Sequence, residues 1–219
     1  MRILIINPNT SSATNIRIRA IVEPLVHAPD EVEVVSAQSG IEFIETIVQS
    51  MSTVPAVLDL VEMRHESVDA IIIAAFSDPG LCEARAIAAC PVLGISEAAM
   101  KMAARIADRF SIITLGPQLC GAINENATSY GVAEQLTEIR VLPWTVAEVS
   151  SNPSAHKKAF ADACENIVSK QGLGAVIIGG GPLSGIADAI AGDLPIPVLD
   201  GVRCAVDMAL ELYRQEIHT

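Results

Sequence analysis

Apolar and polar residues follow two different periods along the chain. Short continuous apolar runs bounded by turn residues predict buried strands, and stretches with apolar residues three and four apart predict helices between them. The predicted strands cover residues 2–6, 31–35, 69–75, 91–95, 109–114, 138–142, 175–179 and 196–199. The predicted helices cover residues 12–27, 53–66, 79–89, 96–107, 117–129, 153–170, 184–191 and 201–216. This alternation favours an α/β fold with mainly parallel sheets.

Three of the predicted helices begin at capping signals. Ser11 or Ser12 is expected to cap the first helix, because a hydroxyl at this position accepts a hydrogen bond from the first turn. Asp78 precedes Pro79, and Asn152 precedes Pro153, so each pair predicts a cap followed by proline at the first helical position.

The sequence also repeats weakly, at an offset of about 106 residues. Any one buried strand resembles another, so a single match carries little weight. Three matches at nearly one offset indicate an internal duplication. The matching pairs are 2–7 with 109–114, 69–75 with 174–180, and 91–94 with 197–200, at offsets of 107, 105 and 106.

The duplication predicts two pseudo-symmetric lobes, each a mainly parallel sheet flanked by helices. We expect residues 1–95 with 200–219 in one lobe and residues 96–199 in the other. Ligands of such sheets bind beyond the carboxyl ends of the strands, so the cleft between the lobes is the predicted active site. The loops expected to line it are residues 7–11, 75–80, 114–117 and 179–185.

Composition narrows the classes of function. With 51% hydrophobic residues the chain is not intrinsically disordered, and its net charge of −12 with 3% aromatic residues argues against a nucleic-acid partner. No apolar run reaches the roughly 20 residues that span a bilayer, and the N-terminal run is too short for a signal peptide. We therefore expect a cytoplasmic protein with a small-molecule substrate and no membrane partner.

The five cysteines suggest neither a disulfide framework nor a metal site. Their number is odd and their spacing contains no CxxC or CxxH pattern, so we expect no metal and reduced, mostly buried thiols. They are Cys82, Cys90, Cys120, Cys164 and Cys204.

Two of the cleft loops carry hydroxyl, amide and carboxylate groups. Asn9 and Thr10 lie where the first helix begins, so this loop either binds a carboxylate or polarised carbonyl or is simply a capped turn. Ser77 and Asp78 follow the third strand, beside Ala75 and Phe76, which are predicted to contact the substrate. Asp78 is either the helix cap or a catalytic base.

The glycine-rich loop at 179–185 has neither the G-x-G-x-x-G spacing of a dinucleotide site nor the lysine of a phosphate-binding loop. Bare backbone N–H groups here suit close approach to a small substrate. Gly180, Gly181 and Pro182, with Thr114 from the neighbouring strand end, are therefore predicted to contact the substrate. No cofactor is implied.

Several segments, in order along the chain, resemble the aspartate/glutamate racemase superfamily and within it the hydantoin and allantoin racemase branch. They are Ile5-Ile6-Asn7-Pro8-Asn9-Thr10-Ser11, Phe76-Ser77-Asp78-Pro79-Gly80-Leu81, Pro91-Val92-Leu93-Gly94-Ile95-Ser96-Glu97-Ala98-Ala99 and Phe110-Ser111-Ile112-Ile113-Thr114. The resemblance implies two pseudo-symmetric α/β lobes with a small-molecule site between them, no cofactor, and a homo-oligomer.

The resemblance also implies a pair of catalytic cysteines, one at an equivalent strand end of each lobe, which move the proton next to a carbonyl. These positions fall on Ala75 and Gly180, and neither is cysteine. We therefore expect an enzyme that acts on a small cyclic ureide or related carbonyl compound by hydrolysis or elimination, with Asp78 and Ser77 as catalytic residues. Two alternatives stay open: racemisation with bases other than cysteine, and a binding protein that has lost catalysis.

Overall fold

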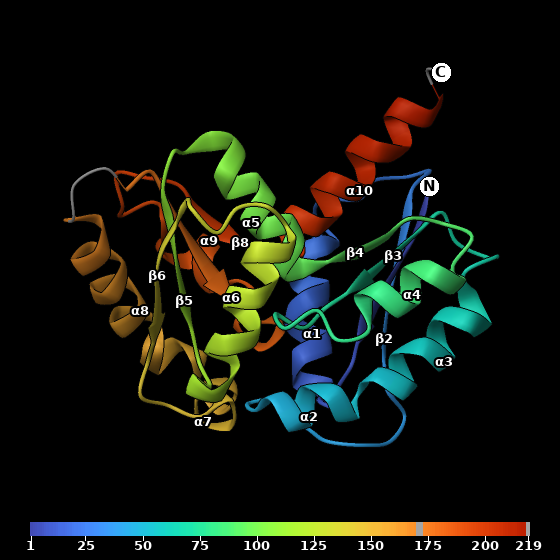
Figure 1. The fold of residues 1–219 in the computed structure, drawn as a ribbon, viewed down its shortest axis with the longest axis horizontal. Helices are drawn as coiled ribbons and strands as arrows, with labels where there is room; N and C mark the ends of the chain where they lie inside the picture. The colour runs from blue at the N-terminus through green and yellow to red at the C-terminus, as the bar shows by residue number, and fades with distance from the viewer. Residues whose placement is uncertain (170–172, 218–219) are drawn as a thin grey trace.

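The computed structural model describes residues 1–169 and 173–217, and its strands form two four-stranded sheets of the same design (Figure 1). Strand order is β2-β1-β3-β4 in the first sheet and β6-β5-β7-β8 in the second, and neighbouring strands pair in parallel. The strands are β1 (Arg2–Asn7), β2 (Glu31–Ser36), β3 (Ala70–Ile73), β4 (Val92–Gly94), β5 (Phe110–Thr114), β6 (Leu136–Val141), β7 (Ala175–Gly179) and β8 (Val198–Asp200). The predicted fold class is confirmed.

The helices follow the prediction with two additions. They are α1 (Ser12–Val22), α2 (Ile47–Ser52), α3 (Val54–Arg64), α4 (Leu81–Ile87), α5 (Ile95–Ile106), α6 (Cys120–Ser129), α7 (Val146–Ser151), α8 (Pro153–Val168), α9 (Ile186–Ala191) and α10 (Gly201–Ile217), with 3₁₀ turns η1 (Pro117–Leu119) and η2 (Gly181–Leu183). The first helix ends at Val22 rather than at 27. Residue 170, the predicted end of α8, lies outside the described residues. None of the described helices is long and apolar enough to cross a bilayer.

The two additions, α2 and α7, were not predicted. Both have only six residues, too few to display a clear helical period. Each begins with a capping box, Thr46 with Gln49 and Thr145 with Glu148, in which the side chain and backbone of each residue pair with the other. That motif was readable in the sequence and is the signal that could have located them.

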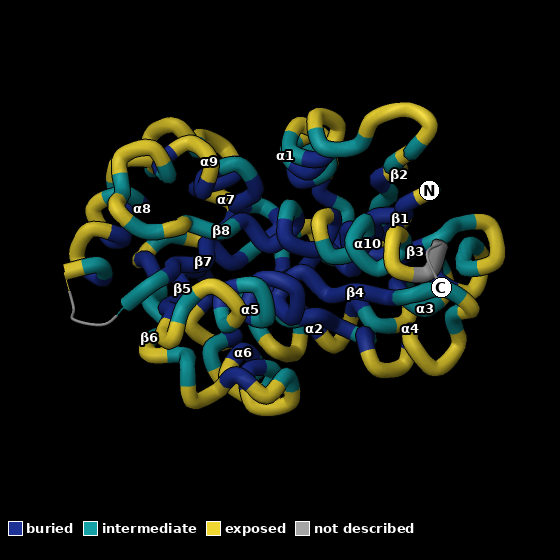
Figure 2. The backbone as a smooth tube through the Cα atoms, turned by 90° about the horizontal axis from the view of Figure 1, so that it is seen from above, coloured by how far each residue is buried: buried dark blue, intermediate teal, exposed yellow. Residues whose placement is uncertain are grey.

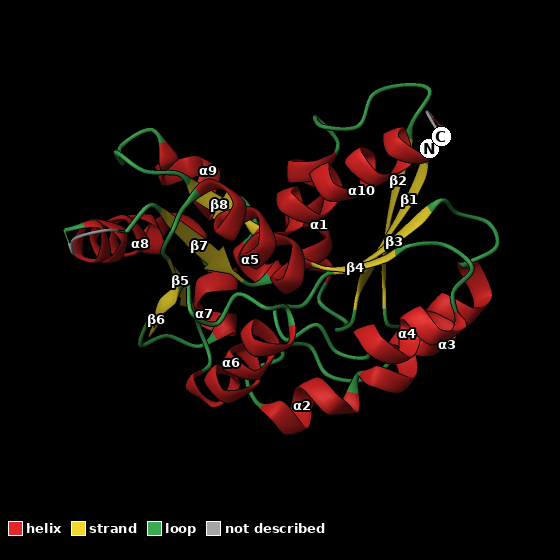
Figure 3. Cartoon of the chain, turned by 45° about the horizontal axis from the view of Figure 1, so that its top comes forward, coloured by secondary structure: helices red, strands yellow, loops and turns green. Residues whose placement is uncertain are grey.

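Helices α5 and α10 join the two sheets into one body. Helix α10 contacts β3 and β4 of the first sheet and β7 and β8 of the second, α5 contacts β4, β7 and β8, and the two helices pack on each other. Figure 3 shows both helices, with α1, between the two sheets. Because each helix contacts both sheets, the expected assignment of 1–95 with 200–219 to one lobe and of 96–199 to the other stays a prediction.

The core explains why the central strands read as uninterrupted apolar runs. Strands β3, β5 and β7 are buried along their whole length, while β2 and β6 are the partly exposed edges (Figure 2). One hydrophobic cluster extends from Ile72 in the first sheet through Met100 and Val206 to Ile177 in the second. The lobes therefore share a core, and the cleft between their strand ends rests on a packed base.

Two of the predicted caps are confirmed. The hydroxyl of Ser11 accepts from the backbone N–H of Thr14 (3.4 Å), and the side chain of Asn152 accepts from that of Ala155 (3.3 Å). Pro153 is the first residue of α8, as expected.

The predicted cap at Asp78 is wrong. Asp78 has φ 46° and Gly80 has φ 73°, so neither is helical and α4 begins only at Leu81. The Asp78 carboxylate instead accepts from the backbone N–H groups of Ser96 (3.1 Å) and Glu97 (2.9 Å), in the first turn of α5. Asp78 thus caps a helix 18 residues downstream.

The second lobe makes the corresponding contact from a different residue. Asp200, the repeat counterpart of Gly94, accepts from the N–H groups of Val202 (2.9 Å) and Arg203 (3.2 Å) at the start of α10. Its other oxygen accepts from Gly185 N–H (2.9 Å), in the loop after β7. Each lobe therefore places one buried carboxylate at the start of a long helix, in lobe 1 from the loop after β3 and in lobe 2 from the end of β8.

The structure leaves no space for a side chain at position 94, and this leads to the first prediction. A Cβ there would lie 2.3 Å from Cγ of Asp78, so Gly94→Ala should displace the carboxylate and lower the free energy of unfolding by about 3 kcal/mol. Urea denaturation at fixed pH measures this. The control is Gly121→Ala in α6, where a Cβ meets nothing within 4 Å and alanine should stabilise the helix by about 0.5–1 kcal/mol. Equal stability of the two variants would contradict the proposed crowding.

Candidate active site

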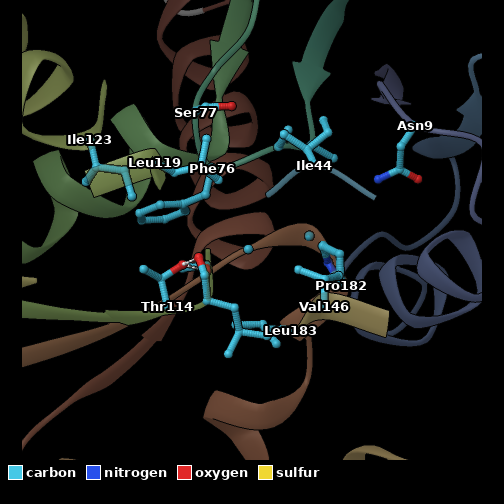
Figure 4. A pocket seen from close by; sticks show the side chains of 16 residues that line it. Asn9, Ile44, Phe76, Ser77, Thr114, Leu119, Ile123, Val146, Pro182 and Leu183 are labelled. Carbon is cyan, nitrogen blue, oxygen red and sulfur yellow. Dashed lines mark hydrogen bonds between the residues drawn. The ribbon is translucent and has the colours of Figure 1, made fainter. Parts of the chain in front are cut away.

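A cavity of about 500 Å³, including its open mouth, lies at the carboxyl ends of β3, β5 and β7. It is the place where the two-lobe fold predicted a ligand site. Its lining comes from both lobes (Figure 4). The lining residues are Asn9, Ile44, Ala74, Ala75, Phe76, Ser77, Thr114, Leu115, Leu119, Ile123, Val146, Gly179, Gly180, Gly181, Pro182 and Leu183.

The structure gathers most of the predicted site residues around this cavity and leaves two away from it. Thr10 and Asp78 do not line it. The hydroxyl of Thr10 instead donates to Ile41 O (3.2 Å). The gathered residues are Asn9, Ala75, Phe76, Ser77, Thr114, Gly180, Gly181 and Pro182.

Asn9 presents a hydrogen-bond donor to the cavity. Its side-chain oxygen accepts from the backbone N–H of Ser11 (2.9 Å), which fixes the orientation of the amide. Figure 4 shows the amide nitrogen directed toward the cavity, and it has no partner among the described residues. Asn9 can therefore donate to a ligand carbonyl.

Two hydroxyls act as acceptors on the cavity wall. Thr114 donates its proton to Gly179 O (2.7 Å), which leaves the oxygen lone pairs for a ligand N–H. Ser77 Oγ shares a hydrogen bond with Ser50 Oγ (2.7 Å) on α2, and the backbone oxygen of Ser77 accepts from Asn126 Nδ2 (3.2 Å). Ser77 is thereby held between α2 and α6.

The backbone supplies a further set of donors. Among the described residues, the N–H groups of Ala75, Gly180 and Gly181 have no acceptor. Ala75 and Gly180 are repeat counterparts, one residue beyond Ala74 and Gly179, so each lobe contributes such a residue to the cavity lining. Groups of this kind stabilise negative charge that develops on a carbonyl oxygen.

The lining contains no ionisable side chain among the described residues. Each of the five cysteines is free and lies elsewhere, and burial raises the pKa of Cys164 and of Cys204 to about 12. No three His, Cys, Asp or Glu side chains gather in a metal-binding arrangement within the described ranges. The site is electrically neutral.

Asp78 lies next to the cleft, but its carboxylate faces the helices behind the loop. Besides the two N–H groups of α5 it accepts from the hydroxyl of Tyr130 (2.7 Å), at the end of α6. Burial raises its pKa to about 7, and the hydrogen bonds from Tyr130, Ser96 and Glu97 oppose this rise. With its oxygens engaged in this way, Asp78 holds the loop against α5 and α6.

The two positions where the family resemblance places thiols differ in whether the backbone there could carry a side chain. Ala75 has an ordinary backbone and lines the cavity. Gly180 has φ 147°, a conformation that side chains rarely adopt, and a Cβ there would lie 3.3 Å from Cγ of Leu183. The loop after β7 is therefore shaped for glycine at position 180.

Sequence reasoning missed the apolar wall of the cavity. This wall comes from segments outside the strand-end loops, and only the fold brings them there. The residues are Ile44, Leu119, Ile123, Val146 and Leu183, of which Val146 belongs to the unpredicted helix α7.

Known proteins resemble the chain over almost its whole length. The family model "Asp/Glu/Hydantoin racemase" matches residues 3–209. Hydantoin racemases of Pseudomonas sp. strain NS671 and of Rhizobium meliloti are each 30% identical over 210 residues, which is 95% of this chain and 84% and 87% of theirs. The structure of allantoin racemase from Klebsiella pneumoniae superposes with a TM-score of 0.94 and 31% identity, covering 99% of this chain and 89% of that one.

Proposed function

The chain belongs to the Asp/Glu/Hydantoin racemase family, and we propose that its cleft binds a neutral five-membered cyclic ureide of the hydantoin or allantoin type and promotes exchange of the proton at the ligand's stereocentre. The similarity to hydantoin and allantoin racemases favours this alternative over hydrolysis or elimination, which none of these relatives supports. We therefore withdraw the expectation of hydrolytic or lyase chemistry.

The neutral lining is the observation that carries the proposal. Amino acids such as aspartate and glutamate bring fixed charges into a site, and a buried charge needs an oppositely charged partner or several hydrogen bonds. The cavity offers no charged side chain among the described residues. A cyclic ureide has neutral carbonyl and N–H groups, which match the donors of Asn9 and the backbone and the acceptors Thr114 and Ser77.

The same groups favour proton loss next to a carbonyl. Removing that proton moves negative charge onto the carbonyl oxygen, where the free N–H groups of Ala75, Gly180 and Gly181 can stabilise it. No described side chain that lines the cavity gains or loses a proton near neutral pH, so the proton passes to and from water. We expect slow exchange that saturates with ligand.

A second candidate is ligand binding without catalysis. It is favoured by one observation, that Ala75 and Gly180 occupy the two positions where the resemblance places thiols. Deuterium exchange at the ligand's stereocentre separates the two candidates, because binding alone leaves the background rate unchanged.

The second prediction concerns ligand selection. Hydantoin and allantoin should raise the melting temperature of the protein in a saturable way, whereas aspartate and glutamate should not. Asn9→Asp, which replaces the free donor by a carboxylate, should weaken ureide binding at least about tenfold. The control is Asn166→Asp on α8, the same change at an exposed residue. Binding of the amino acids, or of no ureide, would refute the proposal.

A further inference from the structure

Glycines 179 and 181 allow the two lobes to touch at the base of the cleft. A Cβ at Gly179 would lie 2.7–2.9 Å from three atoms of the Phe76 ring, and a Cβ at Gly181 would lie 2.5 Å from Ala74 O. Such distances are too short for any side chain. The glycine-rich loop after β7 is therefore fitted to the loop after β3.

Phe76 is the large side chain at this contact. Only 5% of the residue is exposed, although it lines the cavity. Figure 4 shows its ring between Thr114 on one side and Leu119 and Ile123 on the other. Because Phe76 follows Ala75 and its ring covers Gly179, the ring lies beside Ala75 and Gly180, the two positions where the resemblance places thiols.

Resting on that proposed function, we propose that Phe76 determines substrate specificity. Its ring fills the part of the cleft that a bulky substituent on the ligand's stereocentre would need. Leu119, Ile123 and Gly179 hold the ring in place. The cleft therefore accepts cyclic ureides whose stereocentre carries a short substituent and excludes those that carry an aromatic one.

The structure also indicates what the cleft would accept without the ring. Removing it leaves a space bounded by Leu119, Ile123 and Thr114, with the bare backbone of Gly179 as its floor. Two of these neighbours are apolar, so the space suits a benzyl group. The ring of the ligand would take the place of the ring of the protein.

The test compares hydantoin, 5-methylhydantoin and 5-benzylhydantoin by titration calorimetry. Wild type should bind 5-benzylhydantoin at least about tenfold more weakly than 5-methylhydantoin, and Phe76→Ala should bind the benzyl compound at least about tenfold more tightly than wild type does. Phe76→Leu, which preserves more packing, should show the same trend if the alanine variant folds poorly. Phe160→Leu, the same change at a buried ring of α8 that does not line the cavity, should leave the preference unchanged.

Different results would contradict the role of Phe76 and the proposed function. Equal binding of the methyl and benzyl compounds by wild type, or an unchanged preference in both Phe76 variants, would overturn the role of Phe76 while the proposed function stands. If neither wild type nor the variants bind any hydantoin, the proposed function fails and the role of Phe76 fails with it.

Discussion

Replacing Ala75 by cysteine is expected to raise the rate of proton exchange at the ureide stereocentre by at least about a hundredfold, the usual size of a contribution from a positioned acid or base. Ala75 lines the cavity at the end of β3, and its own N–H group is free. The cleft would then combine stabilisation of the enolate oxygen with a group that carries the proton. The cleft of the unmutated protein lacks only the group that carries the proton.

Nuclear magnetic resonance in heavy water would follow the exchange for single-enantiomer hydantoins. Ala75→Ser is the matched control, because a hydroxyl of similar size is far less acidic than a thiol and should give no comparable gain. Gly180→Cys should gain less than Ala75→Cys, since position 180 has φ 147° and Leu183 lies close. Equal rates for Ala75→Cys and Ala75→Ser would contradict the premise that a proton carrier is the missing part.

Replacing Asp78 by asparagine should change how stability depends on pH. Burial raises the pKa of Asp78 from 3.8 in the unfolded chain to about 7 in the folded protein. The folded protein therefore keeps a proton that the unfolded chain releases. The resulting stabilisation is complete below about pH 4 and is lost as the pH rises through about 7.

The size of this effect depends on how many pH units of the measured range lie between the unfolded and the folded pKa of Asp78. At about 1.4 kcal/mol per pH unit, wild type should lose about 3 kcal/mol more than Asp78→Asn between pH 5 and pH 8. Urea denaturation of both proteins at each pH gives the difference. Burial also raises the pKa of Asp200 and of Asp207, but both residues are present in both proteins and cancel in the comparison. Parallel pH profiles would exclude Asp78 as the titrating group.

The fold was predictable because its signal is local and repeated. Fully buried strands such as β3 and β7 appear as continuous apolar runs, and the repeat placed them at equivalent points of two sheets. The prediction that Asp78 caps α4 failed because Asp-Pro is a local signal. The carboxylate instead accepts hydrogen bonds from α5 and from Tyr130, which is 52 residues away. Local patterns do not contain contacts of that length.

The candidate site was predictable only where it is formed by the strand-end loops. Strand-end loops could be located, so the polar residues Asn9, Ser77 and Thr114 were named in advance. The apolar wall was not, because Ile44 and Val146 reach the cavity from connections whose course depends on the whole fold. The role of the glycines was also beyond the sequence, since it is set by Phe76 of the other lobe.

The exchanged positions of the buried carboxylates bear on how the two halves of the duplicated chain can evolve. One half has aspartate at 78 and glycine at 94, and the other has Asp200 as the counterpart of Gly94. Introducing aspartate at 94 would collide with Asp78, and removing Asp78 first would leave α5 without its carboxylate. Each single step between the two arrangements is thus unfavourable. Transfer of only one of these positions from one repeat to the other would leave the start of the helix with two carboxylates or with none.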